Sequence, residues 1–378
     1  MNEFRFSDNF TLMRKKLGMT QGDVATYIGV SSAAVSKWER GLSYPDLSLL
    51  PKLASLFDTT IDKLLGYEPH LTTATIMELY QTFSKRLSEE NFEMVQKDIE
   101  NMVKEYYSCY PFLVRIAQLY LNHYFYSKKP QLVLNRIVEL CERVVALSDD
   151  HKLIQEAQII YASALLIMNK PQELLKRVGY DIPIQFGVEK LIARAYAMLS
   201  DINKVKETLQ ISAFQHLLSM VSSEIELLKY ASDNQNLFDE MINRIEKVID
   251  IYNIEKLNSH IKLTFYYQAS LGYMKQHRRT DALRMLERFY HTCKHLSFPM
   301  KICGDDYFYI VDNWIEQNIH SGPYAPRNEQ AIKDDLLNML QKESLFVPLH
   351  EDPKFKWMVN NLQRMFQSKP KRENESVS

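Results

Sequence analysis

Apolar residues in the first 66 positions recur at intervals of three and four, in short runs separated by glycine or polar residues. This is the period of a helix with one buried face. Four runs form such faces: Phe10, Met13 and Leu17; Val24, Ala25 and Ile28; Val35 and Trp38; and Leu47, Leu50, Leu53, Ala54 and Phe57. A shorter run follows at Ile61, Leu64 and Leu65. We therefore expect five short helices here.

Capping residues indicate where these helices begin and end. Thr20, Ser31 and Thr60 each precede an apolar run, where a side-chain oxygen can accept from backbone N–H groups of the first turn. Gly29 follows the second run, where glycine tolerates the positive φ that ends a helix. The second and third helices should therefore meet at a tight corner.

From Thr72 onward the pattern predicts one helix after another. Loop signals lie near 20 residues apart, or at a multiple of that spacing, for example at Lys128–Pro130, Asn169–Pro171 and Gln276–Thr280. This spacing suits antiparallel helix pairs.

One such pair, at residues 263–290, has small residues in its first helix and aromatic residues in its second. Ala269 and Ser270 allow close packing, and Phe289 fills the space towards the next pair. The pair resembles a tetratricopeptide (TPR) repeat, and other segments match more loosely. The resemblance implies a degenerate TPR-like α-solenoid of about five to seven helix pairs. The alternative is an irregular helical bundle.

Composition supports the fold class and excludes others. Ten glycines in 378 residues argue against a β-sandwich, a β-barrel or a dinucleotide-binding enzyme, and favour an all-α protein. Charge is balanced, with 46 Lys+Arg against 47 Asp+Glu, so contact with nucleic acid requires a local patch. The four cysteines form no CxxC pair, which fits a reducing cytoplasm. No apolar stretch is long enough to predict a membrane span.

The string from Met19 to Gly41 and the segment Asp58–Gly66 follow the pattern of one family. Their spacing places Ala25 where two helices touch, Gly29 at the corner and Val35 as an anchor. The segment resembles the helix-turn-helix of the phage-repressor/Cro (XRE-type) DNA-binding family. The resemblance implies a five-helix repressor-type DNA-binding domain over about one sixth of the chain.

The resemblance makes the helix after Ser31 the recognition helix, which lies in the major groove of DNA. Serine can exchange hydrogen bonds with base edges, lysine and arginine can reach guanine or phosphate, and alanine offers a methyl contact to thymine. A polar residue that begins the preceding helix can hold a phosphate. The predicted DNA contacts are Gln21, Ser31, Ser32, Ala33, Ser36, Lys37 and Arg40.

Local charge limits what one copy of this domain can do. Residues 1–66 carry eight Lys+Arg and seven Asp+Glu, so two half-sites on a dimer would supply the needed contacts. We expect Arg14, Lys15 and Lys16 to form a cationic edge near the duplex. We expect Glu39 to be structural, or poised near the backbone, rather than to read a base. The alternative is a helical module that binds protein, or one that has lost its DNA contacts.

An XRE-type helix-turn-helix followed by a TPR-like solenoid resembles the peptide-responsive transcription regulators of the Rgg and PlcR kind. The resemblance implies a cytoplasmic homodimer that binds a two-fold operator in double-stranded DNA and senses a short peptide. Three alternatives stay open. The solenoid could bind a partner protein, the protein could be a repressor without an effector, or, least favoured, it could be an enzyme.

The concave face of such a solenoid could hold an extended peptide. Tyrosine and asparagine make rigid or bidentate contacts with a peptide backbone. The candidate ligand residues are Asn122, Tyr124, Tyr161, Tyr266 and Tyr267. The competing interpretation for each tyrosine is a place in the core, where aromatic residues at helical spacing usually lie.

Signals for catalysis or metal binding are weak. His291 and His295 share a helix face, but Cys293 points elsewhere and no fourth ligand is evident. The sequence also lacks a phosphate-binding glycine loop. We therefore expect no catalytic residue, no cofactor and no metal.

The predicted organisation has five parts. They are a helix-turn-helix domain at 1–66, a linker at 67–71, the TPR-like domain at 72–300, a C-terminal helical cap or dimerisation region at 301–367 and a disordered tail at 368–378.

Overall fold

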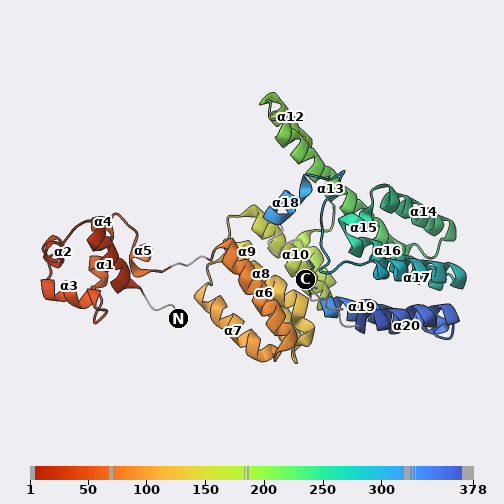
Figure 1. Cartoon of the computed structure of the whole chain (residues 1–378), viewed down its shortest axis with the longest axis horizontal. Coiled ribbons are helices and arrows are strands. Elements are labelled where there is room, and N and C mark those ends of the chain that lie inside the picture. The colour runs from red at the N-terminus through yellow and green to blue at the C-terminus, as the bar shows by residue number, and fades with distance from the viewer. Residues whose placement is uncertain are drawn as a thin grey trace, which may run out of the picture. The chain divides into compact units, whose positions relative to one another are not determined.

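A computed structural model describes residues 5–67, 71–182, 184, 187–318, 324–325, 327 and 329–367. Within these ranges the regular elements are helices, with an isolated antiparallel bridge between Lys301 and Tyr324 (Figure 1). The all-α prediction is therefore confirmed. None of the described helices is long and apolar enough to cross a membrane. The predicted tail and most of the predicted linker lie outside the described residues.

The chain divides into two compact units, Met1–Pro171 and Gln172–Ser378. The predicted TPR-like domain at 72–300 crosses this division, which the sequence pattern did not indicate. The predicted boundaries at residues 66 and 300 stay predictions.

The first unit begins with the five expected short helices. They are α1 (Phe6–Lys16), α2 (Gln21–Ile28), α3 (Ser32–Glu39), α4 (Leu50–Leu56) and α5 (Ile61–Leu65), with a 3-10 turn at Leu47–Leu49 before α4. Their apolar faces form one core cluster. The Phe10 ring lies at its centre, edge-on to Trp38 and Phe57 at centroid distances of 6.0 and 5.3 Å.

Two expected core positions are wrong. Leu17 is 52% exposed and Leu47 is 81% exposed. Leu17 is the C-cap of α1, where the chain has left the helical path, and Leu47 opens the 3-10 turn before α4. Phe6, which the sequence pattern did not indicate, is fully buried instead.

The predicted caps are confirmed. The hydroxyls of Thr20, Ser31 and Thr60 accept hydrogen bonds from backbone N–H groups three residues ahead, at 3.1, 3.2 and 3.2 Å. Asp23 completes a reciprocal box by accepting from the Thr20 backbone N–H at 2.7 Å. Gly29 ends α2 with φ at 84°, in the left-handed region where glycine is favoured. The corner between α2 and α3 is thus held from both sides.

Longer helices complete the first unit. They are α6 (Thr73–Glu89), α7 (Phe92–Glu105), α8 (Tyr110–His123), α9 (Pro130–Leu147) and α10 (His151–Ile167). Helix α8 packs against α6, α9 and α10, and most of its side chains are buried.

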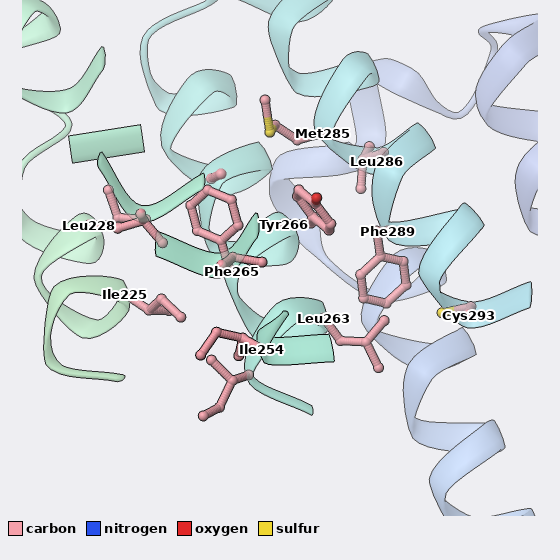
Figure 2. Packing of buried hydrophobic residues seen from close by; sticks show 14 of the residues in the cluster. Ile225, Leu228, Ile254, Leu263, Phe265, Tyr266, Met285, Leu286, Phe289 and Cys293 are labelled. Carbon is pink, nitrogen blue, oxygen red and sulfur yellow. The ribbon is translucent and has the colours of Figure 1, made fainter. Parts of the chain in front are cut away.

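The second unit is also built from helices. They are α11 (Pro171–Val178), α12 (Val188–Met198), α13 (Ile202–Leu227), α14 (Gln235–Ile251), α15 (Ile254–Leu257), α16 (Ser259–Lys275), α17 (Arg279–Lys294), α18 (Val311–Asn318), α19 (Glu329–Gln341) and α20 (Pro353–Gln367). Helices α16 and α17 pack closely, as expected for residues 263–290. Figure 2 shows Phe265, Leu286 and Phe289 in the shared core. The TPR-like solenoid stays a prediction.

Gly272 marks a close approach between α14 and α16. Alanine is ordinarily preferred to glycine within a helix by about 1 kcal/mol. Here, however, an added Cβ would lie 2.1 Å from Cζ of Phe238. That ring is fully buried and meets Tyr273 edge-on at 5.2 Å, so it has no room to move aside.

We therefore expect Gly272→Ala to lower the free energy of unfolding by about 1–3 kcal/mol, measured by urea titration. Gly22→Ala in α2 is the control, because its added Cβ meets atoms only at ordinary contact distances of 3.6 and 3.9 Å. Unchanged or increased stability of Gly272→Ala would contradict the close α14–α16 packing.

Candidate DNA interface

Helix α3 has one face in the core and one face in solvent. Val35 is fully buried and Trp38 is 4% exposed, and both belong to the core of the domain. The helix packs against α1 and α2. Ser32, Ala33 and Lys37 lie on its exposed face. The orientation of α3 is thus fixed by its apolar side, which leaves its polar side free to meet a ligand.

The other predicted contacts on and around α3 differ in their surroundings. Arg40, the C-cap residue, is exposed, and its Nε donates to the Ser36 carbonyl at 3.3 Å. Ser36 itself is half-buried. Ser31 is exposed, but its hydroxyl already accepts the capping bond from the Ala34 N–H. For these residues DNA contact stays a prediction.

A largely buried ion pair ties α1 to α3. The guanidinium of Arg14 donates to both carboxylate oxygens of Glu39, at 2.6 and 3.1 Å, and to the Met19 carbonyl at 2.6 Å. The two charged side chains are only 12% and 10% exposed. The structural role expected for Glu39 is therefore confirmed. Arg14, expected on a cationic edge, is instead sequestered by Glu39, and Lys15 and Lys16 are the exposed cations of that segment.

Gln21 joins the same network. Its side-chain Nε2 donates to Glu39 Oε2 at 2.6 Å, which connects the first residue of α2 to the last residue of α3. The sequence placed Gln21 against a phosphate, and this contact within the protein was not foreseen. The donors that remain for the predicted phosphate contact are the second N–H of the Gln21 side-chain amide and the backbone N–H at the start of α2.

The network also sets the charge state of Glu39. Burial alone would raise the pKa of this carboxyl, but hydrogen bonds from Arg14 and Gln21 outweigh burial, and the pKa is lowered. Glu39 is therefore ionised at neutral pH. Its charge is matched by Arg14 inside the domain, so it adds little repulsion towards a nearby phosphate.

Two large apolar side chains near α3 escaped the sequence analysis. Tyr27 of α2 is 61% exposed and Leu42, in the turn after α3, is 66% exposed. Neither belongs to a helical face of the core, and the helix period therefore gave no signal for them. Their exposure makes them candidates for apolar contact with a partner of the domain.

The five candidate peptide contacts have very different surroundings. Tyr161 and Tyr266 are only 6% and 5% exposed, which is the core position that the sequence left open for aromatic residues. The Asn122 amide donates to the Tyr80 hydroxyl at 3.0 Å, and the Tyr267 hydroxyl donates to Glu343 at 3.1 Å. Tyr124 is half-buried. Ligand contact stays a prediction for Asn122, Tyr124 and Tyr267, whereas burial leaves Tyr161 and Tyr266 little surface to offer.

The histidine–cysteine string does not assemble a metal centre. Cys293 is 2% exposed and lies in the core, as Figure 2 shows, while His291 and His295 are exposed. Nδ1 of His295 is hydrogen-bonded to the His291 carbonyl at 2.8 Å. Across the residues that the structure describes, no group of three or more His, Cys, Asp or Glu side chains could hold a metal ion.

The capped corner, the buried anchor residues and the outward polar face of α3 together define a helix-turn-helix domain. A family model described as Helix-turn-helix matches residues 12–64. The chain is 36% identical over 69 residues to the HTH-type transcriptional activator BcrR of Enterococcus faecalis, which covers 18% of this chain and 34% of that protein. It is 39% identical over 67 residues to the HTH-type transcriptional regulator AnsR of Bacillus subtilis (strain 168), which covers 18% of this chain and 58% of that protein.

The similarity therefore extends over less than two thirds of the length of either relative. No solved structure matches the chain.

Proposed function

We propose that this protein is a sequence-specific DNA-binding transcription regulator. The observation that carries the proposal is the orientation of α3. Val35 and Trp38 lock one face into the core, while Ser32, Ala33 and Lys37 are exposed on the other. The names of both relatives support this proposal, because each describes an HTH-type transcriptional regulator or activator.

In this function α3 enters the major groove with its N-terminal turn nearest the bases. Ser32 and Ala33 lie in that turn and suit hydrogen bonds to base edges and methyl contact with thymine. Lys37 and Arg40 lie one and two turns further along and reach guanine or a phosphate. The Arg14–Glu39–Gln21 network holds α1, α2 and α3 at fixed angles, so that these side chains are presented together.

The net charge of the domain argues for two copies on one site. With eight Lys+Arg against seven Asp+Glu in residues 1–66, a single copy neutralises few phosphates. A homodimer that reads two half-sites one helical turn apart doubles the contacts.

Footprinting of purified full-length protein on DNA of its source organism tests the proposal. We expect protected sites with two-fold symmetry at physiological salt, and their occupancy should fall steeply as salt is raised. Protection that is absent, or spread evenly along the DNA, would overturn sequence-specific binding.

For the longer helical part of the chain, we propose effector sensing in the cytoplasm, with a short peptide as the effector. The helix pairs of α6–α10 and of α16–α17 support this idea, as does the resemblance to Rgg- and PlcR-type regulators. A ligand that prefers one conformation of the helical part would shift the population that is competent to bind DNA. A partner protein as ligand, or a repressor without an effector, are the alternatives.

Operator affinity measured with and without peptides purified from culture medium separates these cases. A saturable change in affinity on adding a peptide supports the peptide effector. An unchanged affinity across all peptide fractions favours the alternatives, and it leaves the proposal of DNA binding intact.

A further inference from the structure

Helix α12 exposes its apolar stripe to solvent. Val188, Leu191, Ile192, Ala195 and Leu199 follow one another at helical spacing and share one face. Val188, Leu191 and Leu199 are 56%, 62% and 76% exposed, and Met198, at the edge of the stripe, is 87% exposed. Of the α12 residues, only Ala193 on the other side is buried. The face that the sequence pattern marks for burial is therefore uncovered.

The helix that follows also exposes apolar side chains. The first turns of α13 pack against α12, while from Phe214 onward the helix enters the core of the unit, with Leu217 and Val221. Ile202 and Leu209 in the first half remain 55% and 44% exposed. Within the second unit, α12 lies at the start of α13, away from α14–α17 (Figure 1). The two helices thus form a hairpin, residues 188–209, with apolar surface on both arms.

The exposed area matches what a stable interface needs. A large aliphatic side chain carries roughly 100 Å² of apolar surface, from a burial free energy of about 2.5 kcal/mol at about 25 cal/mol per Å². The exposed fractions of the seven large side chains of the hairpin then amount to roughly 400 Å² of apolar surface. About 57% of a typical interface is apolar, so this apolar area corresponds to roughly 700 Å² of buried surface on each copy. A standard interface buries about 800 Å² per partner.

We propose that residues 188–209 form a self-association surface, on which the hairpins of two copies pack as a four-helix bundle. This inference rests on the proposed function, to whose homodimer it assigns a surface. A two-fold interface brings the same patch of each copy together, so an apolar stripe faces an identical stripe. Two helices from each copy, each with an apolar side, supply the four helices of such a bundle.

The area and the two-fold operator favour a second copy as the occupant. Another helix pair with apolar sides is a complement to such a pair of helices. A DNA reader with two half-sites also requires a symmetric contact between its two copies, and this hairpin lies outside the helix-turn-helix domain.

The test uses the full-length chain with two glutamates placed in the stripe, Leu191→Glu with Leu199→Glu. Each places a carboxylate in the proposed bundle core, where an unpaired charge is strongly disfavoured. Lys190→Glu is the matched control, because it introduces the same side chain beside Leu191 but on the polar side of α12. Molar mass is measured by light scattering over a range of concentrations without DNA, so the result does not depend on operator binding.

We expect the wild-type chain and Lys190→Glu to show twice the chain mass of 44.5 kDa. The double variant should run as a single chain, with a dimer Kd raised at least about 100-fold. The unfolding temperature of the wild type should rise with protein concentration, while that of the variant should not.

Three results would overturn the proposal. The first is a wild-type chain that stays at single mass throughout the concentration range. The second is a dimer that survives both glutamates, which would place the interface elsewhere. The third is a concentration-independent melting of the wild type together with a large loss of stability in the variant. That pattern would show that another segment of the same chain covers the stripe.

Discussion

Replacing Lys37 and Arg40 together by alanine is expected to abolish specific operator binding by the full-length chain, while the domain stays folded. Both side chains are exposed and lie outside the core cluster of the domain. Loss of a base or phosphate contact costs about 1–3 kcal/mol each, so the Kd should rise between about 30-fold and 10⁴-fold.

Fluorescence anisotropy with a labelled operator, repeated at several salt concentrations, measures this effect. The slope of log K against log salt should fall by about 0.9 for each phosphate contact that is lost. Lys52→Ala with Lys63→Ala is the control. Both lysines are exposed, and replacing them removes the same amount of positive charge, but from α4 and α5. Equal affinities for the wild type and the Lys37/Arg40 variant would show that α3 is not the recognition helix.

Arg14→Ala is expected to destabilise the N-terminal domain strongly. The substitution removes the charge partner of the Glu39 carboxylate, which is 10% exposed, and leaves it the neutral Gln21 amide as a donor. Removal of one partner from a buried ion pair costs about 3–5 kcal/mol. A domain of this size is stable by only about 3–9 kcal/mol. The loss should therefore take between about a third of this stability and all of it.

Hydrogen exchange measured by mass spectrometry on the full-length chain localises this loss. Peptides from residues 5–67 should lose protection in Arg14→Ala, whereas peptides from α16 and α17 should keep it. Lys15→Ala, at the exposed neighbouring position, should leave protection unchanged. Retained protection of α1–α3 in Arg14→Ala would show that the ion pair does not hold the three helices together.

The same ion pair gives the domain a specific sensitivity to acid. The pKa of Glu39 is lowered in the folded state from its ordinary value of 4.5. The ionised group therefore stabilises the fold above about pH 4.5, and this contribution is lost as pH falls through the lowered pKa. Protection of residues 5–67 should accordingly fall off more steeply below pH 4.5 in the wild type than in Glu39→Gln, which has no carboxyl to titrate. Identical acid profiles would contradict this role.

Most of the correct predictions from the sequence came from short-range patterns. Thr20, Gly29 and Ser31 act on neighbouring backbone groups, so their roles can be inferred from position alone, and all three are confirmed. The anchors Val35 and Trp38 follow from the helix period and are also confirmed. These local signals were sufficient to predict the corner and the orientation of α3.

Contacts between distant residues could not be predicted in the same way. Arg14 and Glu39 are 25 positions apart, and one sequence gives no signal that they meet. A tyrosine at helical spacing looks the same whether it lines a groove or lies in a core, and Tyr161 and Tyr266 lie in the core. The apolar stripe of α12 can be seen in the sequence, but the periodicity of one helix does not indicate which surface covers it.

Selection from a library of random DNA duplexes tests the central proposal most directly. Purified full-length protein is incubated with the library at physiological salt, and the bound duplexes are sequenced. The proposed function predicts enrichment of one motif made of two inverted half-sites, about 10 base pairs apart from centre to centre. Bound sequences that show no enrichment over the starting library would contradict sequence-specific DNA binding by this protein.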